Sequence, residues 1–167
     1  MDILLRAEQA SDKEFLLALY ASTRAKELEL VPWTDSQKKD FLKMQFQAQS
    51  VHYHDHYPNA AYQIILSGQQ PIGRLYVDRA SDEIHVIDIA LLPEYRGAGI
   101  GGTLLRRLLD EAAEKQKPVR IYVELENPAR RLYTRLGFRF LEMNNPYGLM
   151  EWKPGIESGI GLEAYFR

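Results

Sequence analysis

Residues 87–102 read IDIALLPEYRGAGIGG, an apolar strand pattern that passes through Pro93 into a glycine-rich turn at the start of a helix. The glycines of this turn are Gly97, Gly99, Gly101 and Gly102. They lack side chains where a backbone must approach another group closely, and the free N–H groups and positive dipole end of a helix N-terminus attract phosphate. Arg96 adds a cation beside them. The stretch therefore predicts a phosphate-binding loop.

The composition favours a single globular domain. The chain has 167 residues, of which 46% are hydrophobic and 26% are charged, enough to bury a sizeable core. We expect this domain to span 1–153, with a glycine-containing tail at 154–167 docked on the domain or on a partner subunit. The chain has no cysteine, which excludes disulfides, thiolate metal sites and a cysteine nucleophile.

Charge and hydropathy limit the partners of the protein. A net charge of -2 does not favour binding to a nucleic-acid backbone or to an anionic membrane, because both require a clustered basic surface. The first residues, MDILLRAEQ, lack the basic and then apolar pattern of a leader, and no apolar run reaches the length of a membrane span. These features predict a cytoplasmic protein with no nucleic-acid or membrane partner.

Hydrophobic periodicity and turn signals predict alternating helices and strands. Ser11 with Glu14, and Thr34 with Gln37, form capping-box patterns at the starts of two helices. Because a strand, a helix and a second strand follow one another after residue 83, those two strands should be parallel. The expected strands are 3–8, 62–66, 72–77, 83–92, 119–125, 139–142 and 148–152, and the expected helices are 11–23, 34–53, 103–116 and 127–137.

Apolar residues at helical spacing predict which face of each long helix is buried. The expected buried residues are Phe15, Leu16 and Leu19 in the first helix, Phe41, Met44 and Ala48 in the second, and Leu104, Leu105, Leu108, Leu109 and Ala112 in the third. Pro32 predicts a loop between the first two helices, and Pro58 ends the secondary-structure element that precedes it.

Several interpretations fit a glycine-rich turn. Residues 97–102 match GxGxxG, and Glu124 ends the next strand where a ribose-binding acid is sought, so a dinucleotide-binding fold is a rival. Against it, the glycines come more than halfway along the chain and follow strands expected to be antiparallel. A Walker loop lacks its Gly-Lys-Ser/Thr. The remaining interpretation is a tight strand-to-helix turn without a ligand.

Two motifs resemble one family. The sequence RGAGIG at 96–101 is similar to the Arg/Gln-x-x-Gly-x-Gly/Ala signature of the GNAT acyltransferases, and NPARRLYTRLGF at 127–138 resembles their second hallmark. The expected order of elements from 3 to 153 also resembles the family, whereas the tail lies outside it. The resemblance implies an α/β fold in which a central mixed sheet of six to seven strands is flanked by about four helices.

The resemblance also implies a co-substrate, acetyl-CoA or another short acyl-CoA, with its pyrophosphate on the amides of 97–102. The family breaks its central sheet at a bulge, here near Ala90 and Leu91, and the Leu91 amide would polarise the thioester carbonyl as an oxyanion donor. The residues that the resemblance assigns to the co-substrate are Leu91, Leu92, Arg96, Gly97, Ala98, Gly99, Ile100, Gly101, Gly102, Thr103, Asn127, Arg130 and Tyr133.

The absence of cysteine fits direct transfer of an acetyl group to a primary amine in a ternary complex. The resemblance points to Tyr133 as the acid that protonates the departing thiolate, since a phenol is neutral at working pH. Packing of its helix on the sheet is the other interpretation of Tyr133. For the general base, the resemblance points by position to His85 in the strand before the glycine turn, with Asp88 and Glu124 in reserve, unless water relays the proton. A partly exposed strand histidine without a catalytic role is the other interpretation of His85.

Asn127 also has two interpretations. It resembles the asparagine that contacts pantetheine in the family, although it stands six residues before Tyr133 and many relatives use seven, which would select Glu126. A role as a helix cap explains Asn127 equally well.

Aromatic residues near the first two expected helices are candidates for the acceptor pocket, because these segments cover the acceptor in the resembling family. They are Trp33, Tyr53, Tyr57 and Tyr76, and ordinary core packing is the alternative for each. His52, His54 and His56 suggest a metal site, since the first and last share a helical face. Without a third ligand or a paired glutamate motif, we expect no metal.

The sequence therefore predicts an acetyl-CoA-dependent N-acetyltransferase acting on a small-molecule or peptide amine, and the resemblance adds a homodimer. The alternative is a non-catalytic acyl-CoA-binding sensor or partner-binding module of the same fold. Tyr133 favours the enzyme, whereas the weakly defined base keeps the alternative open.

Overall fold

The computed structural model describes residues 2–155, which form two compact units that alternate along the chain. The first unit contains residues 2–76 and 88–98, and the second contains 77–87 and 99–155. The single domain expected over 1–153 stays a prediction. The docking predicted for the tail concerns residues that lie, from 156 onward, outside the described part of the chain.

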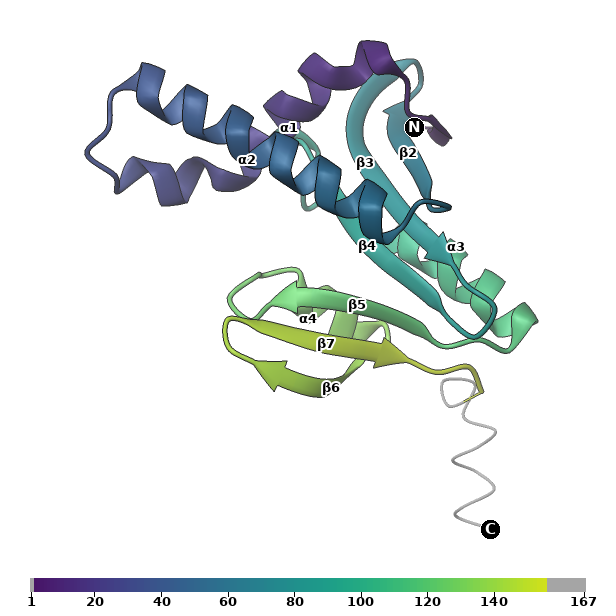
Figure 1. Ribbon diagram of the computed structural model, residues 1–167. Helices are drawn as coiled ribbons and strands as arrows, with labels where there is room; N and C mark the ends of the chain where they lie inside the picture. The colour runs from purple at the N-terminus through teal and green to yellow at the C-terminus, as the bar shows by residue number, and fades with distance from the viewer. Residues whose placement is uncertain (1, 156–167) are drawn as a thin grey trace. The chain divides into compact units, whose positions relative to one another are not determined.

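A seven-stranded mixed sheet and, within residues 2–155, four α-helices make up the fold, so the predicted α/β class is confirmed (Figure 1). The strand order is β1-β2-β3-β4-β5-β7-β6. The strands are β1 (Ile3–Ala7), β2 (Ala61–Ser67), β3 (Gln70–Arg79), β4 (Ile84–Leu91), β5 (Val119–Glu124), β6 (Arg139–Asn144) and β7 (Tyr147–Trp152). The helices are α1 (Lys13–Glu29), α2 (Asp35–His56), α3 (Ile100–Lys115) and α4 (Arg130–Arg135), with short 3-10 turns η1 (Ala10–Asp12) and η2 (Pro93–Tyr95).

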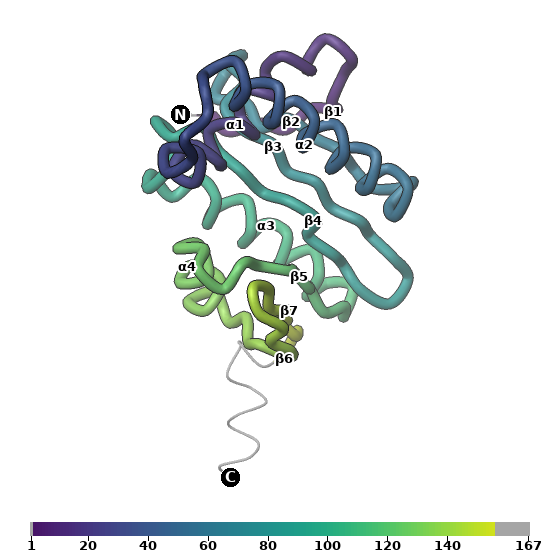
Figure 2. Tube along the Cα trace, turned by 60° about the vertical axis from the view of Figure 1, so that its left-hand side comes forward, coloured from purple at the N-terminus to yellow at the C-terminus, as the bar shows by residue number. Residues whose placement is uncertain are grey.

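In the first unit, α1 and α2 form a helical hairpin that lies beside β2 and β3 (Figure 2). β1 pairs antiparallel with β2 from Ile3↔Ser67 to Ala7↔Gln63. The core of this unit joins both helices to β2 through the buried side chains of Leu16, Tyr20, Phe46 and Ile64. The removal of these side chains from water holds the helical hairpin on the strands.

The start of α1 differs from the prediction. Ser11 lies inside η1 and does not cap the helix. Instead, the Asp12 carboxylate accepts the Gln9 N–H at 2.8 Å and pairs with the Arg6 guanidinium at 2.7 Å. The predicted Ser11 capping box was therefore wrong because the neighbouring carboxylate, with a cation beside it, satisfies the free donor better than a hydroxyl.

Both long helices extend beyond their predicted ends. The capping box of α2 is confirmed, since the Gln37 N–H donates to Thr34 Oγ1 at 3.1 Å. α1 continues to Glu29 because residues 24–29, RAKELE, are strong helix formers. α2 runs for 22 residues to His56, two before Pro58. Even so, within residues 2–155 no helix is both long and apolar enough to cross a membrane.

The buried face of α2 is not the predicted one. Met44 is 58% exposed and Ala48 is exposed, whereas Phe46 is buried. Further along the same face as Phe46, the polar residues Gln49 and Tyr53 make hydrogen bonds to the strands. The prediction was wrong because polar side chains occupy part of the buried face, so periodicity selected a different, apolar row.

In the second unit, β4 runs parallel to β5, as predicted, with Ile84 opposite Val119 and Val86 opposite Ile121. β7 lies between β5 and β6 and pairs antiparallel with both, which confirms the predicted hairpin. The predicted stripe of α3 is also confirmed, since its five residues are all buried: Leu104, Leu105, Leu108, Leu109 and Ala112.

The short turns of the second unit set the starts and ends of its helices. α3 begins at Ile100, three residues before the prediction, because Gly99 precedes it in the left-handed conformation with φ of 83°. α4 begins at Arg130, after a turn at Asn127. Gly137, with φ of 104°, ends α4 as predicted.

Candidate active site

The last peptides of β4 lie against a glycine of β3. A Cβ atom on Gly73 would stand 2.3 Å from the Ala90 carbonyl oxygen and 2.9 Å from Leu91 Cδ2. Beyond this point, the Leu92 N–H donates to the Ile72 carbonyl at 2.8 Å. The N–H and C=O of a trans peptide point in opposite directions, so an Ala90 carbonyl directed at Gly73 turns the Leu91 N–H away from β3.

Arg96 holds the segment that follows β4. Its Nε donates to the Leu91 carbonyl oxygen at 2.9 Å, and its Nη2 donates to Ser22 Oγ of α1 at 3.3 Å. Arg96 is an exposed residue, and a guanidinium carries five N–H donors, of which these contacts use two. Arg96 can therefore brace the loop and face an anion at the same time.

The turn after η2 has the backbone conformation that its glycines predict. Gly97 and Gly99 have φ of 75° and 83°, and no atom lies within 4 Å of a Cβ added at either. Conformation, and not lack of space, therefore requires glycine at both positions. The Thr103 N–H donates to the Gly99 carbonyl at 3.0 Å, which leaves the earlier N–H groups of α3 without partners inside the helix. Open glycines before the N-terminus of a 16-residue helix fit a pyrophosphate group.

A group of four polar residues, of which Arg74 is buried and the others are half-buried, joins α2 to β3 and β4, and we call it the Arg74 network: Gln49, Tyr53, Arg74 and Asp88. Arg74 is 4% exposed and forms an ion pair with Asp88. Its Nη2 also donates to Gln49 Oε1 at 2.8 Å, and the Tyr53 hydroxyl donates to Asp88 Oδ2 at 3.3 Å. Arg74 Nε is buried without a hydrogen-bond partner. Asp88, a reserve candidate for the base, is thus a hydrogen-bond acceptor within a structural cluster.

Burial and charge fix the protonation states of this network. Burial opposes the charge on Arg74, but Asp88 and the neighbouring tyrosines outweigh it and raise the pKa of Arg74 above its ordinary value. Burial, followed by the nearby Asp88, raises the pKa of the Tyr53 hydroxyl. The guanidinium is therefore charged and the phenol neutral over the physiological pH range.

Three of the four aromatic residues predicted for the acceptor pocket lie together in the first unit. The ring of Tyr76 is 6.1 Å from that of Tyr53 and 4.8 Å from that of Tyr62. The Tyr62 hydroxyl donates to the Tyr57 carbonyl at 2.8 Å. Tyr76 also donates a hydrogen bond to Glu8. These residues form an aromatic cluster at the C-terminal end of α2.

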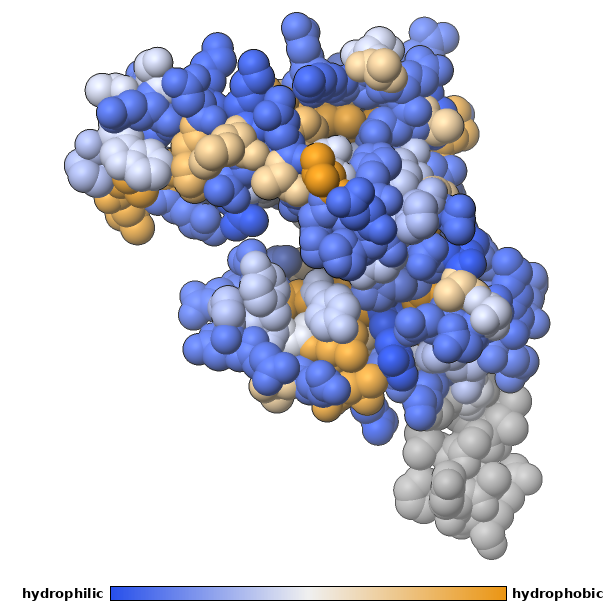
Figure 3. Space-filling view, viewed as in Figure 1, coloured by the Kyte–Doolittle hydropathy of each residue, from blue (hydrophilic) through white to orange (hydrophobic). Residues whose placement is uncertain are grey.

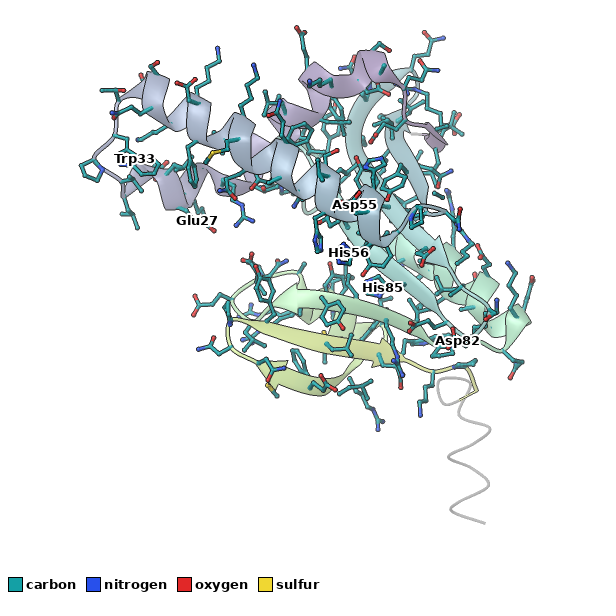
Figure 4. All side chains as sticks on the ribbon, viewed as in Figure 1. Glu27, Trp33, Asp55, His56, Asp82 and His85 are labelled. Atoms are coloured by element: carbon teal, nitrogen blue, oxygen red, sulfur yellow. The ribbon has the colours of Figure 1, made fainter. Side chains whose placement is uncertain are left out.

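Trp33, the fourth, lies at the other end of α2 (Figure 4). A 22-residue helix is about 33 Å long, so Trp33 does not join the tyrosines. It packs edge-on against Phe41 at 5.1 Å and, with Met44 and two polar residues, lines a hollow of about 330 Å³. Figure 3 shows apolar residues gathered over this helical hairpin. The row that periodicity wrongly assigned to the core thus contributes to this surface.

In the second unit, the predicted base His85 lies in β4 and is 8% exposed (Figure 4). Its ring is 5.5 Å from that of Tyr122 on β5. Burial lowers the pKa of His85, with Asp78 opposing this effect and Arg120 adding to it. His85 is therefore neutral near pH 7, the state in which an imidazole can accept a proton.

Tyr133, the predicted acid, is 3% exposed and lies in α4. Its ring is 5.9 Å from that of Phe138, and the Phe138 N–H donates to the Tyr133 carbonyl at 3.0 Å. Both contacts anchor α4 in the second unit. The packing role that the sequence allowed for Tyr133 is thus present, and it fixes the position of the ring.

Asn127 shapes the turn before α4. Its Oδ1 accepts the Ala129 N–H at 2.9 Å, and its carbonyl accepts the Arg130 N–H at 3.2 Å. The N-cap of α4 is Ala129, so the predicted N-cap role of Asn127 was wrong: its side chain closes the turn two residues before the helix cap. The side chains of Arg130 and Glu126 belong to exposed residues. Contact of Asn127 or Arg130 with a co-substrate stays a prediction.

Two of the three histidines near the end of α2, His54 and His56, make side-chain hydrogen bonds to carbonyls of their own helix. His54 Nδ1 donates to the Ser50 carbonyl at 2.7 Å, and His56 Nδ1 donates to the His52 carbonyl at 2.9 Å. The rings of His52 and His56 are 4.1 Å apart. Across residues 2–155, no three metal-ligating side chains are grouped to hold a metal ion.

Gly73 and Arg74 are the site residues that the sequence analysis missed. A glycine inside an apolar strand indicates close approach of another backbone, which is the case here. An arginine inside the same strand requires a buried partner, because an unpaired charge in a core is costly. The sequence holds both signals, but it does not identify Ala90 or Asp88 as the partners.

The fold and the glycine turn define the class of an acyl-CoA-dependent N-acyltransferase, and comparisons with known proteins agree. The model of the Acetyltransferase (GNAT) family matches residues 22–138. The chain is similar to the ribosomal protein bS18 alanine N-acetyltransferase of Haemophilus influenzae, with 29% identity over 102 residues, which are 60% of this chain and 69% of that one. It also matches a mycothiol acetyltransferase of Corynebacterium aurimucosum, with 41% identity over 38% of this chain but only 21% of that protein.

Solved structures share the fold. The PaiA N-acetyltransferase of Thermoplasma acidophilum, solved in complex with coenzyme A, superposes with a TM-score of 0.69 and 18% identity, over 92% of this chain and 99% of that one. Because the family match covers more than half of the sequence, the chain belongs to the GNAT acetyltransferase family. The protein is an N-acetyltransferase with acetyl-CoA as its co-substrate.

Proposed function

We propose that this protein transfers an acetyl group directly from acetyl-CoA to a primary amine of a small molecule or peptide, in a ternary complex. The observation that carries this proposal is the close approach of the Ala90 carbonyl oxygen to Gly73, from which we infer that the Leu91 N–H points away from β3. Acetyl-CoA supplies the acetyl group as a reactive thioester. The sequence has no cysteine to form a covalent acyl-enzyme, which favours direct attack by the amine.

In the first unit, the Leu91 N–H donates a hydrogen bond to the thioester carbonyl oxygen, where negative charge develops. Arg96 keeps this peptide in place through the Leu91 carbonyl and presents its remaining donors to phosphate. The N–H groups of residues 97–103, at the turn before α3 and in its first residues, bind the pyrophosphate. The conformations of Gly97 and Gly99 support this role.

In the second unit, His85 accepts the proton that the amine loses, directly or through water, because burial keeps its imidazole neutral. Tyr133 holds a phenolic proton and gives it to the sulfur as the carbon–sulfur bond breaks. The two transfers balance, since the amine loses one proton and the thiolate gains one. The fixed ring of Tyr133 supports its assignment as the acid.

The acceptor class rests on both relatives and aromatic residues. One relative is a ribosomal protein alanine N-acetyltransferase and another is a mycothiol acetyltransferase, so peptide and small-molecule amines are both represented. We propose that Tyr53, Tyr57 and Tyr76, together with Trp33, contact the acceptor. We also propose that the protein works in the cytoplasm and that it forms a homodimer. A measurement of its molecular mass in solution tests the dimer.

The test combines a binding measurement with an acceptor panel. Calorimetry measures acetyl-CoA binding, and release of the CoA thiol measures turnover on an alanyl peptide, a polyamine, an amino acid and an aminoglycoside. Turnover on at least one amine, with an acetylated product detected by mass spectrometry, supports the proposal. Tight binding with no turnover on any amine would support the non-catalytic alternative, and no binding would contradict both.

A further inference from the structure

We propose that Arg74 is a positioning residue for acetyl transfer, because its network holds the end of β4 so that the Leu91 N–H keeps its direction. This inference rests on the proposed role of Leu91 as oxyanion donor. Gln49, Arg74 and Asp88 are proposed to touch neither the acetyl group nor the acceptor, whereas Tyr53 also belongs to the proposed acceptor site. They act through the backbone between Asp88 and Leu92.

Three consecutive residues of β3 make contacts around the Leu91 peptide. Arg74 is paired with the Asp88 carboxylate, Gly73 lies against the Ala90 carbonyl, and the Ile72 carbonyl accepts the Leu92 N–H at 2.8 Å. These contacts reach β4 both before and after the Leu91 amide. The backbone between them therefore has little freedom to rotate that amide.

The network also ties this part of β4 to α2. Gln49 and Tyr53 are four residues apart, so their side chains share one face of the helix. Gln49 accepts from Arg74 at 2.8 Å, and Tyr53 donates to Asp88 at 3.3 Å, so each half of the ion pair has its own contact with the helix. Within the first unit, a shift of Asp88 relative to α2 would break the Tyr53 bond, and a shift of Arg74 relative to α2 would break the Gln49 bond.

Arg74 is fixed on its other side by an aromatic ring. Its guanidinium carbon lies 4.8 Å from the centre of the Tyr76 ring, and Tyr76 in turn donates a hydrogen bond to Glu8, the residue after β1. Stacking of this kind immobilises the planar guanidinium. The Arg74 guanidinium therefore stays in place, and Asp88 would lose its ion pair if the end of β4 shifted.

Stability alone accounts poorly for this arrangement. The desolvation of a buried ion pair offsets most of its attraction, and apolar side chains of similar size often stabilise a core equally well. The unpartnered Arg74 Nε adds a further cost. Charge-assisted hydrogen bonds are directional, however, and impose a geometry that apolar contacts do not. The network is thus better suited to fix a direction than to stabilise the fold.

The test measures the thioester carbonyl directly. Difference infrared spectra of acetyl-CoA labelled with ¹³C at the carbonyl are recorded on the full-length protein without acceptor, so loss of a general base has no influence on them. In the wild type, the band should shift to lower wavenumber on binding. In the double variant Arg74→Leu/Asp88→Leu, which leaves no buried charge unpaired, at least about half of this shift should disappear, and kcat should fall about 100-fold, the loss typical of a reacting group misplaced by about 1 Å.

The matched control is Asp12→Asn, which weakens another ion pair of the first unit with one buried partner, Arg6 to Asp12 at 2.7 Å. It should lower the melting temperature but leave the infrared shift and kcat unchanged. Tyr53→Phe removes only one hydroxyl and serves if the double variant fails to fold. It should keep the acetyl-CoA affinity, lose part of the infrared shift, and lower kcat about threefold to tenfold, as expected for the loss of about one hydrogen bond. Because Tyr53 is also proposed to contact the acceptor, the infrared shift, recorded without acceptor, is the deciding readout for this variant.

The outcomes separate the two levels of inference. If the folded double variant, or Tyr53→Phe where the double variant is unfolded, keeps both the infrared shift and kcat, the positioning role is wrong and the proposed function still stands. If the wild type binds acetyl-CoA and turns over without any carbonyl shift, the oxyanion role of Leu91 is wrong, and the positioning role is overturned with it.

Discussion

The two units hold their proposed reactive groups by different means. In the first unit, the Leu91 peptide is set by polar contacts from Arg96 and the Arg74 network, and by the absence of a side chain at Gly73. In the second unit, Tyr133 and His85 are buried side chains held by aromatic neighbours. Polar contacts fix the direction of one N–H group, whereas burial fixes a ring and, for His85, lowers its pKa.

This difference teaches where each unit is vulnerable. A backbone donor cannot be removed by changing its own side chain, so the first unit fails only when neighbouring residues move the backbone. A side-chain acid or base can be removed without moving anything. Substitutions in the two units should therefore separate geometry from chemistry, as the following four predictions do.

The largest effect is expected in the second unit, from Tyr133→Phe. This change removes the proton donor and keeps the ring that packs against Phe138. Loss of a general acid should lower kcat about 1,000-fold, within the range typical of such residues. Stopped-flow thiol release measures this effect, and calorimetry should show unchanged acetyl-CoA affinity. Phe138→Leu is the packing control, with lower stability and a much smaller loss of kcat. A loss under tenfold in Tyr133→Phe would leave Tyr133 with a packing role only.

In the first unit, Gly73→Ala should have the next largest effect. The added Cβ would stand 2.3 Å from the Ala90 carbonyl oxygen, so the backbone at Leu91 must shift. Misplacement of about 1 Å should lower kcat about 100-fold. Ile72→Val, on the same strand, removes one methyl group and should cost about 1 kcal/mol of stability with kcat nearly unchanged. Equal kcat values for the two variants would contradict the positional role of Gly73.

A smaller effect, but a change in pH dependence, is expected for His85→Gln. Because burial lowers the pKa of His85 below 6.5, the wild-type rate should be flat near pH 7 and fall on acidification only below pH 6.5, as the imidazole becomes protonated. The variant should be about tenfold slower at pH 7, since water then relays the proton, and it should lose this acidic limb. A profile of kcat/KM from pH 5 to 9 measures both. An acidic limb that persists in the variant would exclude His85 as the base.

The smallest effect should come from Trp33→Ala, at the end of the helical hairpin. Trp33 is 41% exposed and lies far along α2 from the tyrosine cluster. If it contacts the acceptor, the KM for the best amine should rise about threefold to tenfold, the loss of one apolar contact, with the acetyl-CoA affinity unchanged. Leu30→Ala is the matched control, because Leu30 is 88% exposed and adjoins the same hairpin. An equal rise in both variants would indicate a general change of this surface.

Much of the fold could be predicted from local patterns. The buried stripe of α3 and the Thr34–Gln37 capping box follow from spacing alone and are confirmed. The face of α2 could not be predicted in this way, because the half-buried Gln49 and Tyr53 face the strands through hydrogen bonds to Arg74 and Asp88, which lie in other elements. Periodicity counts apolar residues and does not recognise a polar residue with a buried partner.

The same distinction between local patterns and tertiary contacts applies to the candidate site. The sequence by itself determined the glycine turn, since the left-handed conformations of Gly97 and Gly99 are a local property of the chain. It also determined the family, because both hallmark motifs are contiguous. Only the tertiary structure decided the direction of the Leu91 amide and the partner of Arg74. Both depend on which residue of β3 lies opposite which residue of β4, and a strand carries no local record of its register with a neighbour.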